Sequence, residues 1–341
     1  MGNLALAAVL AAISWNTLTG PTLAAADKIV IAHRGASGYL PEHTLEAKAM
    51  AYAMGADFLE QDIVLTRDDV PIVLHDIHLD TVTDVAEQFP DRRRADGRYY
   101  AIDFTLAEIQ RLKVHERIDL KTGKPVFEHR FPVGRSHFTV PTLAEEIELI
   151  QGLNQSTGRN VGIYPELKAP AWHRAEGKDL AHIVLNTVNA YGYRTRSDRI
   201  YLQCFDFDTL RRLRRDLGTD IKLVHLISEN SWNEAPTDFD HPRTPEGIRS
   251  IAEVVNGIGP TIGHIITDID ADGRPITTDL VKLAHSAGLE VHPYTFRADA
   301  LPAWAPSLDD LLRLFFGEVG VDGVFTDFPD RTVGFLRRNS R

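Results

Sequence analysis

The sequence predicts a (β/α)₈ barrel, the α/β fold in which eight parallel strands alternate with helices. Strand-like and helix-like stretches alternate along the chain, there are eight strand-like runs, and polar residues gather where several of those runs end. Alternation of strands and helices favours parallel pairing through right-handed crossovers. Eight strands fit a closed barrel better than an open doubly wound sheet.

The strand-like runs are short and rich in β-branched and aromatic residues. They are Ile29–Ala32, Phe58–Leu65, Gly162–Leu167, Ile200–Phe205, Ile221–Ile227, Gly257–Ile266, Glu290–Phe296 and Gly323–Asp327. The sixth run is glycine-rich and lacks clear alternation. Helices are expected between most of these runs, at Thr44–Met54, Thr142–Gln151, Leu180–Tyr191, Asp206–Leu217, Thr278–Ala287 and Leu308–Glu318.

Two segments do not follow the repeat. Residues 78–138 are long, polar and mixed in charge, and we expect a small inserted subdomain there because structureless loops of that length are uncommon. Ser228–Arg249 contains several prolines and is expected to form a long loop over one end of the barrel.

The N-terminal segment, residues 1–26, predicts a signal peptide. It carries no charged side chain, and its apolar stretch from Leu4 to Ile13 precedes Ala24-Ala25-Ala26. This pattern is too short for a membrane span and is typical of secretion, although no Lys or Arg precedes the apolar stretch. The alternative is an ordinary buried helix. We expect a periplasmic or secreted protein with its catalytic domain at residues 27–341 and no stable membrane anchor.

Composition excludes some partner classes. The chain has 341 residues and a formal net charge of −11 at pH 7. We therefore expect no nucleic acid and no anionic membrane as partner, although a few cations in a pocket can still bind a small anion. Cys204 is the only cysteine, so no intramolecular disulfide can form. A homodimer remains open.

Acidic residues within two of the predicted strands indicate a cation site. Glu60 and Asp62 stand two apart in an apolar strand, so they point to the same face. Carboxylates side by side repel unless a cation or a proton lies between them, and oxygen ligands favour Ca²⁺ or Mg²⁺ over zinc. Glu166 could complete the site, and Lys168 on the same face could bind a phosphate oxygen.

Basic residues follow two further apolar runs. His33 and Arg34 come directly after the first strand, before Gly35, and His75 ends the run Val73-Leu74. A proton-transfer role suits the pKa of a histidine, whereas a single histidine taken alone is more often structural. Residues at the carboxyl ends of barrel strands meet at one face, which is where barrel enzymes place their sites.

These and other motifs together resemble the glycerophosphodiester phosphodiesterase family, in particular its bacterial periplasmic branch. The matching stretches are His33-Arg34-Gly35, Leu40-Pro41-Glu42-His43-Thr44, Glu60-Gln61-Asp62, His75-Asp76, Pro165-Glu166-Leu167-Lys168, Tyr201-Leu202-Gln203-Cys204-Phe205, Val291-His292-Pro293-Tyr294-Thr295 and Phe325-Thr326-Asp327-Phe328-Pro329. They run in order through the chain after the N-terminal segment. The family implies a barrel with a small insertion after the second strand.

The resemblance implies a role for each of these residues. Ca²⁺, or else Mg²⁺, would be held by Glu60, Asp62 and Glu166. Arg34 and Lys168 would bind the phosphate. His33 and His75 would serve as general base and acid. The glycerol and head-group side would be lined by Gln203, Phe205, Tyr294 and Phe328.

The implied reaction is hydrolysis of glycerophosphodiesters to sn-glycerol 3-phosphate and an alcohol. It would run either through a cyclic phosphate formed by the glycerol 2-hydroxyl or by direct attack of water. One alternative is a phospholipase D-like enzyme that cleaves lysolipids on the same fold. The other is a non-catalytic envelope protein that binds diesters.

Overall fold

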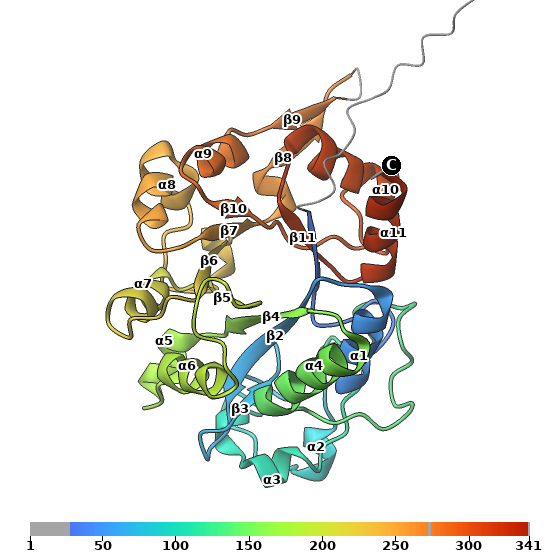
Figure 1. Cartoon of the computed structure of the whole chain (residues 1–341). Coiled ribbons are helices and arrows are strands. Elements are labelled where there is room, and N and C mark those ends of the chain that lie inside the picture. Colours follow the sequence, from blue (N-terminus) through green and yellow to red (C-terminus); the bar gives the residue numbers. More distant parts are fainter. Residues whose placement is uncertain (1–27, 272–273, 340–341) are drawn as a thin grey trace, which may run out of the picture.

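The computed structural model describes residues 28–271 and 274–339 (Figure 1). The predicted signal peptide lies outside these residues. Within them, none of the helices combines the length and the apolar character that a bilayer crossing requires.

Eight parallel strands form the barrel, in the order β10-β7-β6-β5-β4-β2-β1-β11. Their bounds are β1 Ile29–Ala32, β2 Phe58–Leu65, β4 Gly162–Leu167, β5 Tyr201–Cys204, β6 Lys222–Ile227, β7 Gly257–Pro260, β10 Glu290–Val291 and β11 Gly323–Thr326. The ring is completed where the chain near β10 meets β11, since the Phe325 amide donates to the Pro293 carbonyl at 3.0 Å. The predicted barrel is confirmed.

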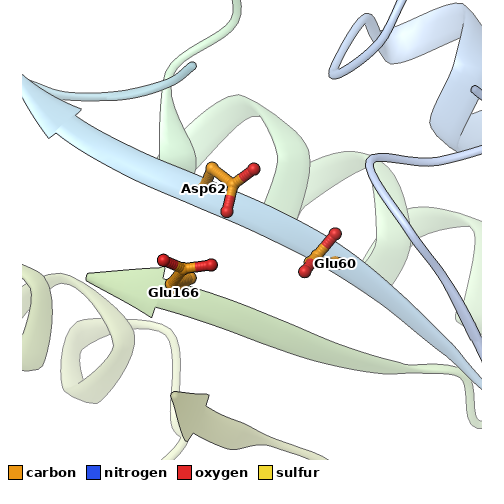
Figure 2. A group of neighbouring side chains, drawn as sticks. All are labelled: Glu60, Asp62 and Glu166. Atoms are coloured by element: carbon orange, nitrogen blue, oxygen red, sulfur yellow. The ribbon is translucent and has the colours of Figure 1, made fainter. Parts of the chain in front are cut away.

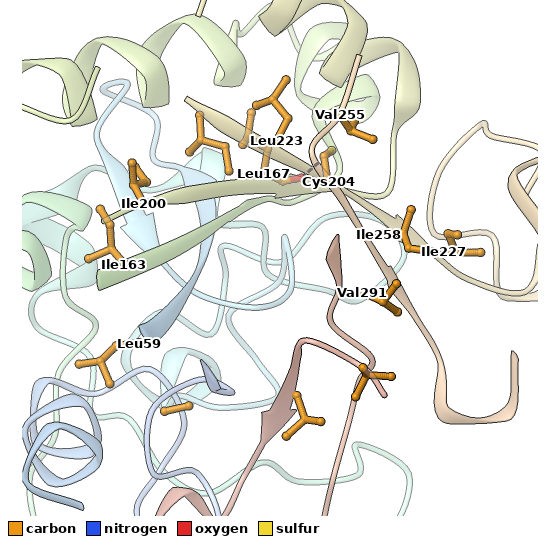
Figure 3. Packing of buried hydrophobic residues seen from close by; sticks show 14 of the residues in the cluster. Leu59, Ile163, Leu167, Ile200, Cys204, Leu223, Ile227, Val255, Ile258 and Val291 are labelled. Atoms are coloured by element: carbon orange, nitrogen blue, oxygen red, sulfur yellow. Dashed lines mark hydrogen bonds between the residues drawn. The ribbon is translucent and has the colours of Figure 1, made fainter. Parts of the chain in front are cut away.

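Helices surround this ring of strands on the outside (Figure 1). The longer ones are α1 Leu45–Met54, α4 Leu143–Thr157, α6 Leu180–Ala190, α7 Phe207–Arg215, α8 Pro245–Ala252, α9 Leu280–Ser286, α10 Leu308–Arg313 and α11 Pro329–Asn339. They pack on the outward faces of the strands, where Leu59, Ile163, Leu202 and Ile258 are buried. Figure 3 shows part of this core, in which the Cys204 thiol donates to the Leu167 carbonyl.

The inward faces of the strands are divided along the barrel axis. Phe58, Tyr164, Tyr201 and Phe325, which stand at the first or third positions of their strands, form a buried aromatic cluster, with Tyr164 and Tyr201 stacked at 4.7 Å between ring centroids. Because side chains alternate along a strand, the next inward positions towards the carboxyl ends belong to other residues. Those positions carry the acidic and polar side chains predicted from the sequence.

The insertion, residues 78–138, has a hydrophobic cluster of its own. Leu79, Phe104, Leu112 and Phe138 are buried there, together with Val64 near the end of β2. The short strand β3, Pro71–Val73, pairs antiparallel with β2 and leads into the insertion. Its short helices are α2 Val85–Gln88 and α3 Leu106–Ile109. The predicted insertion after the second strand is therefore confirmed.

Two of the predicted strands end several residues earlier in the structure. The sixth strand ends at Pro260 instead of Ile266, because a 3₁₀ turn follows at Ile262–His264 and the hairpin of β8 Ile266–Ile269 and β9 Pro275–Thr277 comes next. The seventh strand ends at Val291 rather than Phe296. Proline at position 293 has no amide hydrogen to donate to a ladder, and Tyr294 and Phe296 form only isolated bridges.

Several helical segments were not predicted. The expected loop 228–249 contains the 3₁₀ turns Asn230–Trp232 and His241–Arg243, and α8 begins in it at Pro245. The helices α5, Pro170–Ala175, and α11 also escaped prediction. Each of α5, α8 and α11 starts with a proline. In a sequence a proline is typical of a loop, but it is also tolerated in the first turn of a helix.

Burial makes the stability of this fold depend on pH. His225 on β6 is buried beside Phe207 and Phe239, and burial lowers its pKa to about 4. Between about pH 6.5 and 4 the unfolded chain therefore binds a proton that the folded chain excludes, so the free energy of unfolding falls as pH falls. We predict that His225→Gln flattens this dependence by up to about 1.4 kcal/mol per pH unit. Urea unfolding of both proteins at several pH values measures it, and parallel curves would contradict it.

Candidate active site

Strand register brings the three predicted metal ligands together. Asp62 on β2 lies directly beside Glu166 on β4, and Glu60 points the same way two residues earlier (Figure 2). One carboxylate oxygen from each side chain lies within 4.8 Å of the other two, and all three residues are buried. Glu60 and Asp62, two residues apart on β2, therefore form a cluster of three carboxylates with Glu166 on the adjacent strand β4.

The cluster fits a hard divalent cation. Its donors are all oxygens, and Oδ1 of Asp62 is buried without a hydrogen-bond partner among the described residues. Burial raises the pKa of Glu60, and it raises the pKa of Glu166 well above its usual range. The negative charges of the neighbouring carboxylates act in the same direction. A bound cation would supply the positive charge that these side chains need to ionise together.

A buried histidine behind the cluster was not assigned a role from the sequence. Nε2 of His43 lies 2.7 Å from Oδ2 of Asp62, and Nδ1 lies 3.4 Å from the Lys48 ammonium. Burial lowers the pKa of His43 to about 3, so the neutral imidazole donates to Asp62. Although burial opposes it, His43 helps to hold the pKa of Asp62 well below its usual range. The motif around His43 was recognised, but the contact with Asp62 depends on the fold.

His33 is oriented by an aspartate from the other end of the chain. Its Nδ1 lies 2.6 Å from Oδ1 of Asp327, and its Nε2 lies 3.9 Å from Oε2 of Glu60. Backbone pairing between β1 and β11 places the two residues together. The Nδ1–H group of His33 donates a hydrogen bond to Asp327, which leaves Nε2 facing the acidic cluster. No role was assigned to Asp327 from the sequence.

His75 is oriented in the same way by its neighbour in sequence. Its Nδ1 lies 2.6 Å from Oδ1 of Asp76, and its Nε2 lies 3.4 Å from the Lys168 ammonium. Burial and the nearby cations Arg34 and Lys168 lower the pKa of His75 to about 4, so its ring is neutral near pH 7. Lys168 also contacts Oε1 of Glu166 at 2.8 Å.

Arg34 lies in a strained turn against the cluster. Its backbone adopts φ 58°, and its amide donates to Oε2 of Glu60 at 2.8 Å. Its guanidinium contacts Glu42 at 3.0 Å, whereas Nε has no hydrogen-bond partner among the described residues. Gly35, at φ 86°, cannot be replaced without strain, because a Cβ would lie 2.9 Å from the Ala47 backbone.

Ten of the eleven predicted site residues line one cavity of about 640 Å³. Gln203 donates to Oε1 of Glu60, Phe205 lies under the Lys168 ammonium, and Tyr294 donates to the Ile227 carbonyl. Phe328, also expected on this side, packs instead against Tyr39. It lies beyond Thr326, where the strand has ended, so its ring turns away from the cavity. The cavity combines a cation site, two oriented imidazoles and two cations.

Comparison with known sequences shows which family this chain matches. A model described as the glycerophosphoryl diester phosphodiesterase family matches residues 33–331. A glycerophosphodiester phosphodiesterase of Haemophilus influenzae is 46% identical over 330 residues, covering 91% of this chain and 90% of that protein. One from Treponema pallidum is 37% identical and covers 93% of this chain and 94% of its own.

Solved structures agree on the fold. A protein from Silicibacter pomeroyi, provisionally named a glycerophosphoryl diester phosphodiesterase, is 26% identical with a TM-score of 0.67, covering 93% of this chain and 94% of its own. An Oleispira antarctica phosphodiesterase, solved in complex with the product sn-glycerol-3-phosphate, is 20% identical with a TM-score of 0.59, covering 91% and 96%. From the match over nearly the whole described chain, we conclude that this protein belongs to the glycerophosphoryl diester phosphodiesterase family.

Proposed function

We propose that this protein hydrolyses glycerophosphodiesters to sn-glycerol 3-phosphate and an alcohol. The observation that carries the proposal is the meeting of Glu60, Asp62 and Glu166 with two oriented histidines and two cations in one cavity. The relatives from Haemophilus influenzae and Treponema pallidum, which carry the corresponding enzyme name, support it.

The three carboxylates would hold a divalent cation, which we propose to be Ca²⁺, with Mg²⁺ as the alternative. Buried oxygen-only ligands support a hard ion of this kind. When bound, the cation stabilises the negative charge that accumulates on the phosphoryl oxygens. Arg34 and Lys168 add two positive charges beside the cluster. Nε of Arg34 lies 3.6 Å from Oδ2 of Asp62 without a hydrogen bond among the described residues, so its N–H can donate to a phosphate oxygen.

His33 and His75 would exchange the protons of the reaction. Each ring is tied through Nδ1 to a carboxylate, so each presents Nε2 for proton transfer. They also flank the cluster, His33 beside Glu60 and His75 beside Lys168. Two proton-transfer groups on different sides suit a reaction in which one oxygen loses a proton while another gains one.

The glycerol 2-hydroxyl would be the first nucleophile. Its oxygen bonds to phosphorus as the bond to the alcohol breaks. One histidine takes the hydroxyl proton on its free Nε2, and the other, which enters the step protonated on Nε2, gives that proton to the leaving oxygen. Water then opens the cyclic phosphate with the two histidines in exchanged roles, which yields sn-glycerol 3-phosphate. ³¹P NMR during turnover should detect the cyclic phosphate. Solvent ¹⁸O in the product without any detectable intermediate would favour direct attack of water.

We propose that the protein acts in the periplasm or outside the cell. The support is the uncharged, apolar pattern of residues 1–26, which ends in three alanines. Expression of the full chain in a bacterium with an outer membrane, followed by N-terminal sequencing of the periplasmic fraction, tests it. Full-length protein that remains in the cytoplasm would contradict the proposal.

Removal of divalent cations should abolish activity, because the cluster would lose the charge that stabilises the phosphoryl oxygens. We predict that EDTA-treated protein releases no glycerol 3-phosphate from glycerophosphocholine, and that added Ca²⁺ restores release. A coupled enzymatic assay for glycerol 3-phosphate measures it. Full turnover in chelator would contradict the cation site.

His33→Ala and His75→Ala should each lower kcat by about 10²–10⁴-fold, the usual contribution of a general acid or base. A matched control is His182→Ala, since His182 is exposed on α6 and does not line the cavity. Its activity should equal that of the wild type. Wild-type activity in either active-site variant would exclude that histidine from proton transfer.

A further inference from the structure

Two arginines of the insertion lie behind the active-site histidines, outside the cavity lining. Arg117 and Arg130 both belong to residues 78–138, and their side chains are only 17% and 5% exposed. Each contacts the carboxylate that orients one of the two histidines. Neither lines the cavity itself, so neither touches a substrate bound there.

Arg130 reaches His33 through Asp327. Its Nη2 donates to Oδ2 of Asp327 at 2.6 Å, while Oδ1 of the same carboxylate lies 2.6 Å from Nδ1 of His33. Arg130 is itself fixed, because it donates to the Ser37 carbonyl and to both carboxylate oxygens of Asp299. Oδ2 of Asp327 also accepts from Nε of Arg297 at 2.9 Å, so the carboxylate is held by Arg130 and Arg297 on one oxygen and faces His33 with the other.

Arg117 reaches His75 through Asp76 in the same arrangement. Its Nη1 donates to Oδ2 of Asp76 at 2.6 Å, and Oδ1 of Asp76 lies 2.6 Å from Nδ1 of His75. Arg117 also donates twice to Glu42, at 2.6 and 3.2 Å. Glu42 in turn accepts from Arg34 at 3.0 Å. One side chain of the insertion thus supports both an imidazole and a phosphate-binding cation.

We propose that Arg117 and Arg130 are positioning residues, through which the insertion holds both histidines in the orientation needed for proton transfer. The proposal rests on the proposed function, since it takes its catalytic roles from there. A planar guanidinium fixes a carboxylate through directed bonds, and that carboxylate then fixes the tautomer and plane of the ring. The insertion is therefore part of the catalytic apparatus.

The two arginines should differ in their kinetic effect. Arg130 is linked to His33, so its loss should lower kcat and leave KM nearly unchanged. Arg117 is linked to His75 and also to Arg34, so its loss should lower kcat and raise KM. A merely structural role would reduce the amount of folded enzyme without separating the two constants.

The experiment compares Arg117→Met and Arg130→Met with Arg94→Met. Arg94 is a matched control because it also belongs to the insertion and pairs with two carboxylates, those of Asp103 and Glu176. Neither carboxylate is hydrogen-bonded to a histidine. In the calcium-loaded enzyme with glycerophosphocholine, kcat should fall about 10- to 100-fold in the two test variants, as for other lost outer-shell partners. It should be unchanged in Arg94→Met.

Lysine substitutions keep the test decisive if the methionine variants fold poorly. Arg130→Lys retains the charge but loses the forked geometry, so it should recover part of the lost kcat.

In the double variant Arg130→Met with Asp327→Asn, the loss in kcat should be far smaller than the product of the two single losses. The inference would be overturned if the two single losses in kcat multiplied in the double variant. It would also be overturned if Arg117→Met and Arg130→Met had the same kcat as Arg94→Met. A wild-type enzyme that releases no glycerol 3-phosphate would instead remove the proposed function.

Discussion

The burial of three carboxylates at the mouth of one barrel is the constraint on which the rest of the site depends. Glu60, Asp62 and Glu166 are withdrawn from water and lie close enough to repel one another. The surroundings offset this repulsion only in part, through the Lys168 ammonium, the Arg34 amide and the neutral ring of His43. Because the negative charge is only partly balanced by the protein, the cluster is suited to bind a cation.

The barrel supplies this arrangement through the two-residue period of its strands. On β2 the inward positions are Phe58, Glu60 and Asp62, and on β4 they are Gly162, Tyr164 and Glu166. On each strand an aromatic residue of the floor, Phe58 or Tyr164, therefore precedes the acidic residues. The floor closes the lumen below the site, so the polar residues are reached from the carboxyl ends of the strands. The same strand alternation therefore separates the packed half of the lumen from the reactive half.

The barrel and the acidic and basic site residues could be predicted because they follow from short-range patterns, whereas Gln203, Phe205 and Tyr294 were predicted only from the family resemblance. Strands alternating with helices, and polar residues at strand ends, can be recognised locally. What escaped prediction depends on contacts between distant parts of the chain. His33 meets Asp327 across 294 positions, His43 reaches Asp62 through the turn after β1, and Arg130 arrives from the insertion. Nothing in the local sequence around these residues encodes their partners.

Acidic oxygens from β2 and β4 are expected to bind one divalent cation together. Anomalous diffraction at the manganese edge, from crystals of the protein soaked in Mn²⁺, tests this most directly, with Mn²⁺ standing in for the native ion. We expect a single strong peak in contact with Glu60, Asp62 and Glu166 together. A map with no peak among these three side chains, or with manganese bound only elsewhere, would contradict it.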